Sequence, residues 1–190
     1  TTYGLFVNRK LIFKHWLLFL IMGALFVPLG NGLIYVSYIY TTAVNGGLVS
    51  ASQQAITVLL TWLLYQELIN MRQCVGIVIA ATGVLTIITQ GEPSALLRME
   101  FNIGDLIMLA AVVFGAGYNV LIRKVPEQIS VSQLLVIVLF SGSLITLPFY
   151  IAETLYLRPV PLDIFTVFTI LWVGVAVTAI AVAMISFSIR

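Results

Sequence analysis

Charge is what this sequence has least of. Lys, Arg, Asp and Glu make up only 8% of its 190 residues, whereas they make up about a quarter of an ordinary soluble domain. Hydrophobic residues make up 61%, and no charged side chain occurs between residues 16 and 66. This composition excludes a soluble globular domain and predicts an integral membrane protein. The apolar runs are also too long and too many to be a signal peptide.

Residues that carry redox and metal chemistry are equally scarce. The sequence has one cysteine, Cys74, and one histidine, His15, so it offers neither an internal disulfide nor a cysteine metal cluster. No Asp or Glu lies at the centre of an apolar run, which leaves an intramembrane enzyme without its nucleophile, base or metal set. The sequence also lacks a nucleotide-binding loop and a basic patch. We therefore expect no enzymatic activity, no cofactor, no metal and no nucleic-acid partner.

Long apolar segments recur along the whole chain. A bilayer core about 30 Å thick needs roughly 20 apolar residues of helix. Cutting the sequence at charges, paired glycines and polar loops that contain Pro gives six spans, at 16–40, 47–66, 72–90, 103–122, 130–152 and 164–188. The sequence therefore predicts an all-α integral membrane protein with six transmembrane helices.

Lys and Arg are distributed unevenly between the two ends of these spans. Loops rich in Lys and Arg stay in the cytoplasm, so the uneven distribution predicts the orientation. We expect both ends of the chain in the cytoplasm of a bacterial-type inner membrane. The predicted inner side carries Arg9, Lys10, Lys14, Arg72, Arg123, Lys124 and Arg190, and the outer side carries Arg98 and Arg158. Because the sequence begins with Thr and stops at the end of a hydrophobic run, we also expect a piece of a longer protein.

Polar side chains form stripes on several predicted spans, because residues three or four apart share a helix face. We interpret the stripes as the lining of a shared cavity, where amides and hydroxyls bind the polar parts of a solute and aromatic rings cover its apolar parts. Hydrogen bonding between neighbouring helices is the alternative interpretation. The candidate substrate-binding residues are Asn31, Tyr35, Tyr38, Gln53, Gln54, Thr57, Tyr118, Asn119 and Trp172.

Three further patterns predict local structure. Asp105 follows Asn102 by three residues, which is typical of a helix N-terminal cap. Pro28 and Pro148 lie inside predicted spans, where they favour kinks that could act as hinges. A seam of small residues, Gly76, Ala80 and Gly83, indicates close packing of the third span against a neighbour.

Two stretches of the sequence resemble a known family. The segments LLTWLLYQELINMRQCVGIVIAATGVLTII, at 59–88, and FNIGDLIMLAAVVFGAGYNVLIRK, at 101–124, are similar to the EamA-type drug/metabolite transporters. The matching positions are Glu67, Gln73, Gly76, Gly83-Val84-Leu85, Gly104-Asp105, Phe114 and Tyr118. The chain departs from the family pattern at Gln54, where Pro is common, and at Gln66, where Gly is frequent.

The resemblance implies a bundle of ten helices, built from two inverted five-helix repeats with the substrate near the membrane midplane. This chain would then supply helices three to eight, with 1–91 in the first repeat and 92–190 in the second. The resemblance also implies a secondary transporter, in particular an exporter of small polar or amphipathic metabolites, surrounded by membrane lipid. The sequence leaves open whether the protein forms a homodimer. The alternative function is a non-transporting membrane scaffold or channel subunit.

Overall fold

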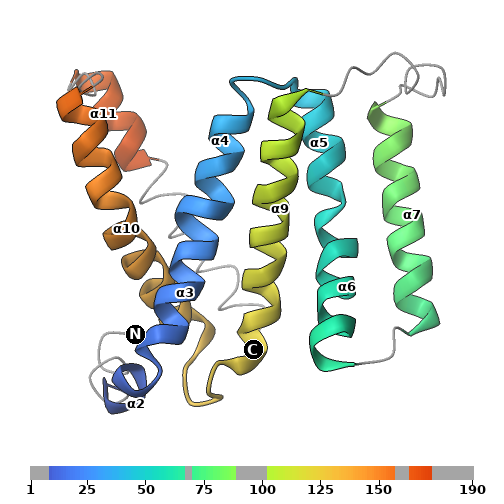
Figure 1. The fold of residues 1–190 in the computed structure, drawn as a ribbon, viewed down its shortest axis with the longest axis horizontal. Helices are drawn as coiled ribbons and strands as arrows, with labels where there is room; N and C mark the ends of the chain where they lie inside the picture. The colour runs from blue at the N-terminus through green and yellow to red at the C-terminus, as the bar shows by residue number, and fades with distance from the viewer. Residues whose placement is uncertain (1–8, 67–69, 89–101, 157–162, 173–190) are drawn as a thin grey trace.

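The fold was analysed in a computed structural model, which describes residues 9–66, 70–88, 102–156 and 163–172. These residues form helices and their connections, and contain no strand (Figure 1). Four helical stretches among them are long and apolar enough to cross a membrane: Trp16–Ser37, Ala43–Tyr65, Ile103–Lys124 and Val131–Tyr156. The predicted all-α membrane fold is therefore confirmed.

The first span is a helix with an irregular centre. It consists of α3 (Trp16–Phe26), a π-helical segment η1 (Val27–Gly32) and α4 (Leu33–Ser37), and the short helix α2 (Arg9–Lys14) precedes it. The irregular segment contains Pro28, which has no N–H to donate to the preceding turn. The change of helix type therefore occurs at one of the two prolines where the sequence predicts a kink.

The second span is divided into α5 (Ala43–Ala51) and α6 (Gln53–Tyr65). At the division, the backbone N–H and the hydroxyl of Ser52 both donate to the carbonyl of Val49, at 3.0 and 2.6 Å. Ser52 thus follows a tighter, three-residue hydrogen-bond pattern before the helix resumes. The span ends at Gln66, whose left-handed backbone (φ 53°, ψ 26°) closes the helix.

The remaining helices are α7 (Met71–Ile88), α9 (Ile103–Leu121) with a 3₁₀ turn η2 (Ile122–Lys124), α10 (Val131–Tyr156) and α11 (Ile164–Leu171). α10 continues as one helix through Pro148, the second predicted kink position. Helix α7 ends next to residues outside the described part, and Trp172, which follows α11, is the last described residue. Most of the predicted span 164–188, and the predicted repeat boundary at 91, lie outside it as well.

Helix α9 stands at the centre of the arrangement. It packs against α3, η1 and α4 on one side and against α5 and α6 on the other, while α10 packs on α3 and α7 packs on α5 (Figure 1). The apolar core between α3, α9 and α10 is built from Phe19, Met22, Tyr118, Ile129, Leu134 and Val138. The first span therefore contacts α9 along its whole length, whereas α10 packs on α3 and η1.

Close backbone approach occurs between α3 and α10. A β-carbon at Gly23 would stand 2.7 Å from the backbone nitrogen of Gly142, and the hydroxyl of Ser141 donates to the carbonyl of Phe19 at 3.0 Å. Small residues allow such contact between membrane helices. The seam predicted on α7 is not formed among the described residues, since a β-carbon at Gly76 or Gly83 would meet nothing within 4 Å.

The positive charges of the described residues gather at one end of the bundle. Helix α2, the start of α7 and the turn η2 after α9 carry these residues and lie at the same end (Figure 1). They are Arg9, Lys10, Lys14, Arg72, Arg123 and Lys124. The path of the chain thus produces the uneven distribution on which the predicted orientation depends.

Candidate functional site

A cavity of about 170 Å³ lies between the first span, the second span and α9. Its lining combines amides, a phenol, two glycines and an apolar wall. The lining residues are Phe26, Gly30, Asn31, Ile34, Gln53, Ala111, Gly115, Tyr118 and Asn119. Four of the nine predicted substrate-binding residues, Asn31, Gln53, Tyr118 and Asn119, therefore surround one cavity.

Both irregular helix segments contribute to this cavity. Gly30 and Asn31 belong to η1, and Gln53 is the first residue of α6 after the break at Ser52. Both segments stand near the middle of their spans. Irregular backbone at membrane depth is tolerated where it is buried in protein or lines a cavity. The two breaks thus bring polar side chains to one place inside an otherwise apolar bundle.

Gln53 lies against α9 at Gly115. A β-carbon at Gly115 would stand 2.9 Å from Nε2 of Gln53, so glycine makes the room that the amide occupies. The backbone carbonyl of Gln53 accepts a hydrogen bond from the Thr57 hydroxyl at 2.8 Å, which ties Thr57 to its own helix. Thr57 does not line the cavity.

Tyr118 and Asn119 approach from α9. The Tyr118 side chain is only 8% exposed, and its ring lies 4.6 Å from the ring of Phe26, centroid to centroid, at an angle of 36°. Within the described residues, the Tyr118 hydroxyl and the side-chain amides of Gln53 and Asn119 have no hydrogen-bond partner. Every fully buried polar side-chain atom among the described residues does have a partner, so these three groups are not fully buried. These three groups consequently face the open space of the cavity.

Asn31 is partly committed to its own helix. Its amide donates to the carbonyl of Phe26 at 2.7 Å, five residues earlier, where η1 departs from α-helical bonding. This bond leaves the amide oxygen of Asn31 as its acceptor at the cavity. The side chain therefore has two functions, because it stabilises the irregular segment and lines the space beside it.

The other predicted residues lie elsewhere. Tyr35 is 73% exposed, and Tyr38 packs its ring on Gly46, where a β-carbon would stand 2.7 Å from Cε1 of the tyrosine. Gln54 is exposed, one position after Gln53. Trp172 is 59% exposed and stacks on Phe168, with 6.1 Å between ring centroids. The structure therefore does not bring these four to the cavity.

Sequence reasoning did not select Phe26, Gly30, Ile34 or Ala111, which complete the lining. Apolar residues and glycines are common in every span, so nothing in the sequence separates these four from their neighbours. Gly30 had one usable signal, since it lies two residues after Pro28 in a segment predicted to bend.

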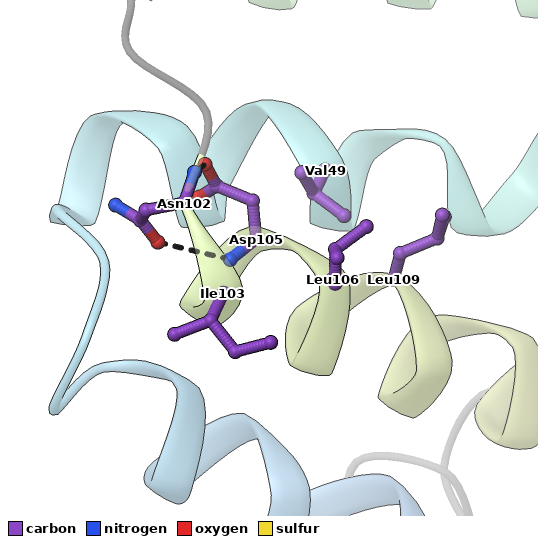
Figure 2. A pocket seen from close by; sticks show the side chains of 6 residues that line it. All are labelled: Val49, Asn102, Ile103, Asp105, Leu106 and Leu109. Atoms are coloured by element: carbon purple, nitrogen blue, oxygen red, sulfur yellow. Dashed lines mark hydrogen bonds between the residues drawn. The ribbon is translucent and has the colours of Figure 1, made fainter.

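A second, wider cavity of about 420 Å³ lies between α5 and the start of α9 (Figure 2). Val49, Ile103, Leu106 and Leu109 give it apolar walls, and Asn102 and Asp105 supply its polar edge. Figure 2 shows the amide oxygen of Asn102 accepting from the backbone N–H of Asp105, at 3.3 Å. This bond belongs to the helix cap, so the polar edge is already engaged within the protein.

Asp105 is the centre of a buried polar network. Its carboxylate is 4% exposed and accepts from the backbone N–H of Asn102 at 2.9 Å, from the Asn45 amide at 3.3 Å and from the Thr41 hydroxyl. Asn102 reciprocates by accepting from the backbone N–H groups of Gly104 and Asp105. The predicted N-terminal cap is confirmed, and it also fastens α9 to the turn between α4 and α5.

Gly104 explains why a small residue precedes this aspartate. A β-carbon there would stand 2.7 Å from the backbone nitrogen of Thr41 and 2.8 Å from the carbonyl oxygen of Ser37. A larger residue would push α9 away from the turn and out of reach of Thr41 and Asn45. The Gly-Asp pair therefore acts as one structural unit.

The site offers binding groups rather than reactive ones. Within the described residues, no three His, Cys, Asp or Glu side chains gather as a metal site would require. The cavity is lined by amides, a phenol and apolar groups, which bind solutes by hydrogen bonds and van der Waals contact.

The family model and the related proteins that match this chain agree with each other. Residues 3–89 match the model of the EamA-like transporter family. The uncharacterized transporter YyaM of Bacillus subtilis (strain 168) is 29% identical over 118 residues, which are 62% of this chain and 39% of YyaM. The predicted resemblance is therefore confirmed.

Two further relatives are also named uncharacterized transporters. YetK of Bacillus subtilis (strain 168) is 26% identical over 114 residues, 60% of this chain and 34% of YetK. A protein of Archaeoglobus fulgidus is 32% identical over 78 residues, 40% of this chain and 23% of the relative. The chain spans less than half the length of these relatives. No solved structure matches it.

Proposed function

We propose that this EamA-like chain is part of a secondary transporter that exports small polar or amphipathic metabolites, such as amino acids, sugars or drug-like solutes, by alternating access. The observation that carries the proposal is the cavity at which both broken spans meet. Transporters commonly place substrate near the membrane midplane at interrupted helices, where side chains and freed backbone groups can contact it. The family match of residues 3–89 and the names of the relatives support the same activity.

The proposed orientation places the end of the bundle that carries α2 and η2 in the cytoplasm of the inner membrane. The positive charges of the described residues gather at that end, and such charges are retained in the cytoplasm. The Asp105 network then lies at the outer end. The cavity lies between the two ends, where access could alternate.

A scaffold or channel subunit is the second candidate function. A scaffold needs polar side chains only as bonds between helices, as in the Asp105 network. Gln53, Tyr118 and Asn119 have no such partner within the described residues. Leaving hydrogen-bonding groups unpaired in a membrane is unfavourable unless something else binds them, which favours a transport cavity.

A growth screen tests the proposal. A strain that overexpresses the natural full-length protein is exposed to toxic amino acids, toxic sugars and cationic drugs, and its tolerance is compared with that of the empty-vector strain. Export predicts raised tolerance to at least one solute class. Unaltered tolerance to every class, with the protein present in the membrane, would favour the scaffold.

Matched variants connect any tolerance to the cavity. Gln53→Leu removes the amide beside Gly115 and should abolish the raised tolerance, whereas Gln54→Leu makes the same change one residue away from the cavity and should preserve it. Equal loss of tolerance in both variants would indicate that any such change in this part of the helix impairs the protein, whether or not the residue lines the cavity.

A further inference from the structure

We infer, on the basis of the proposed transport function, that the cavity selects uncharged solutes that carry a hydrogen-bond donor and acceptor side by side, as a carboxamide does. Carboxylates, ammonium ions and zwitterions of the same size are excluded. This inference narrows the proposed range of metabolites, because it removes free amino acids and cationic drugs.

Among the residues that the structure describes, the lining contains no group that could balance a charge. The polar side chains of this described lining are amides and a phenol, from Asn31, Gln53, Tyr118 and Asn119. An ion that enters a water-poor site without a counter-charge loses its hydration and gains little in return. A neutral solute avoids this cost, so the same hydrogen bonds give net binding only to the neutral form.

Two charged side chains, one on α9 and one on the turn η2 that follows it, are already engaged. Arg123 lies one helical turn beyond Asn119, but its guanidinium stands 5.7 Å from the centroid of the Tyr65 ring, in cation–π contact. Asp105 lies near the opposite end of α9, and Thr41, Asn45 and Asn102 hold its carboxylate. Neither side chain lines the cavity.

The free hydrogen-bonding groups match a carboxamide. Gln53 and Asn119 each offer an N–H₂ donor and a carbonyl acceptor, and Tyr118 adds a hydroxyl that can do either. A carboxamide can satisfy both kinds of group at once. A carboxylate only accepts and an ammonium only donates, so each would leave one kind of group unpaired.

The apolar wall and the size of the cavity further restrict the solute. Phe26, Ile34 and Ala111 offer a surface on which a flat ring can lie, and the tilted ring of Tyr118 borders it. The volume of about 170 Å³ is below the roughly 300 Å³ at which pockets for drug-sized ligands begin. A single aromatic ring that carries one carboxamide combines these properties.

Nicotinamide and nicotinate form a matched pair of probes, because they share a ring and differ in the neutral carboxamide and the ionised carboxylate. The full-length protein is reconstituted in liposomes, and equilibrium binding and counterflow are measured for both at pH 8. We expect nicotinamide to bind at least about tenfold more tightly than nicotinate, and to undergo counterflow. Equal or tighter binding of nicotinate, or binding of neither probe, would overturn the inference.

The two kinds of failure can be told apart. Counterflow of nicotinate would leave the proposed transporter standing and remove only the selectivity. Binding of nicotinamide without any counterflow would keep the selectivity and contradict transport. If neither probe binds, the growth screen still decides whether the protein exports another solute.

Charge variants place the selectivity in this cavity. Gln53→Glu places a carboxyl group in the cavity, which can pair with a bound ammonium ion. The positively charged probe is 3-(aminomethyl)pyridine, which carries an ammonium group on the same ring. Gln53→Glu should lower the ratio of nicotinamide affinity to 3-(aminomethyl)pyridine affinity at least about tenfold. Gln128→Glu makes the same change in the exposed loop after α9 and should not alter the ratio. Asn119→Asp is the second cavity variant and is used if Gln53→Glu does not fold. An unchanged affinity ratio in whichever variant folds would contradict the assignment of the selectivity to this cavity.

Discussion

The side-chain amide of Gln53 lies directly over Gly115, so closely that a β-carbon on Gly115 would stand 2.9 Å from Nε2 of the glutamine. This contact joins the first residue of α6 to the middle of α9. It fixes the position of an amide that has no hydrogen-bond partner within the described residues.

Gly115→Ala should impair the cavity more than the fold. The added methyl group displaces the end of a flexible side chain, which moves at little cost, but the amide then leaves its position in the cavity. We expect at least about a tenfold loss of solute binding and a change in unfolding free energy within about 1 kcal/mol. Gly117→Ala is the control, since its β-carbon would meet only Leu25 Cδ1, at 3.7 Å. Similar binding by the two variants would contradict the role of Gly115.

Gly23→Ala should destabilise the protein by about 1–3 kcal/mol, because the new methyl group meets the backbone of Gly142 at 2.7 Å and backbone cannot easily move. Gly76→Ala, in the open part of α7, should be neutral or stabilising by up to about 1 kcal/mol. Reversible unfolding in detergent measures both variants. The reverse order of stability would show that the seam predicted on α7 is the tighter contact.

Asp105→Asn should destabilise the protein by about 1–3 kcal/mol, although it hardly changes the size of the side chain. One carboxylate oxygen becomes an N–H₂ group, which then faces either the Thr41 hydroxyl, at Oδ1, or the N–H donors of Asn45 and Asn102, at Oδ2, and no longer accepts from them. Asp163→Asn is the control, since that side chain is an exposed cap of α11 and Asn caps equally well. Equal, small changes in unfolding free energy in the two variants would show that the Asp105 network does not stabilise the fold.

Gln66→Gly should stabilise the protein by about 0.5–1 kcal/mol. The residue has a positive φ of 53°, where a side chain costs about 1–2 kcal/mol and glycine avoids this strain at the expense of some chain entropy. The melting temperature should therefore rise, while Gln66→Ala, which keeps a β-carbon, should not raise it. A lower melting temperature for the glycine variant would mean that the side chain makes a contact that offsets the strain.

The spans could be predicted because runs of about 20 apolar residues have few alternatives to crossing a membrane. The cap of α9 could also be predicted, since Asn102 and Asp105 are neighbours in the sequence and form a local motif. The additional bonds from Asp105 to Thr41 and Asn45 could not, because they connect residues about 60 positions apart.

The composition of the cavity was predictable only in part. Helical spacing groups Asn31 with Tyr35 and Tyr38, but η1 changes the phase of the helix between them, and Tyr38 turns onto Gly46. The break at Ser52 likewise decides that Gln53 rather than Gln54 meets α9. Serine and glutamine both tolerate a regular helix, so the sequence gives no signal for that break. Gly76 and Gly23 are also alike in sequence, and only the path of α10 distinguishes them.

The most direct test of the cavity is the accessibility of these two neighbouring glutamines to water. Cys74→Ser removes the sole cysteine of the sequence, and Gln53→Cys or Gln54→Cys is then introduced into the full-length protein in membranes. The rate of labelling by a small, uncharged, water-soluble thiol reagent is measured at each position, because the thiol must meet water to ionise and react. A polar cavity at the junction of the broken spans predicts fast labelling at position 53 and slow labelling at position 54. Fast labelling at 54 with none at 53 would contradict the site.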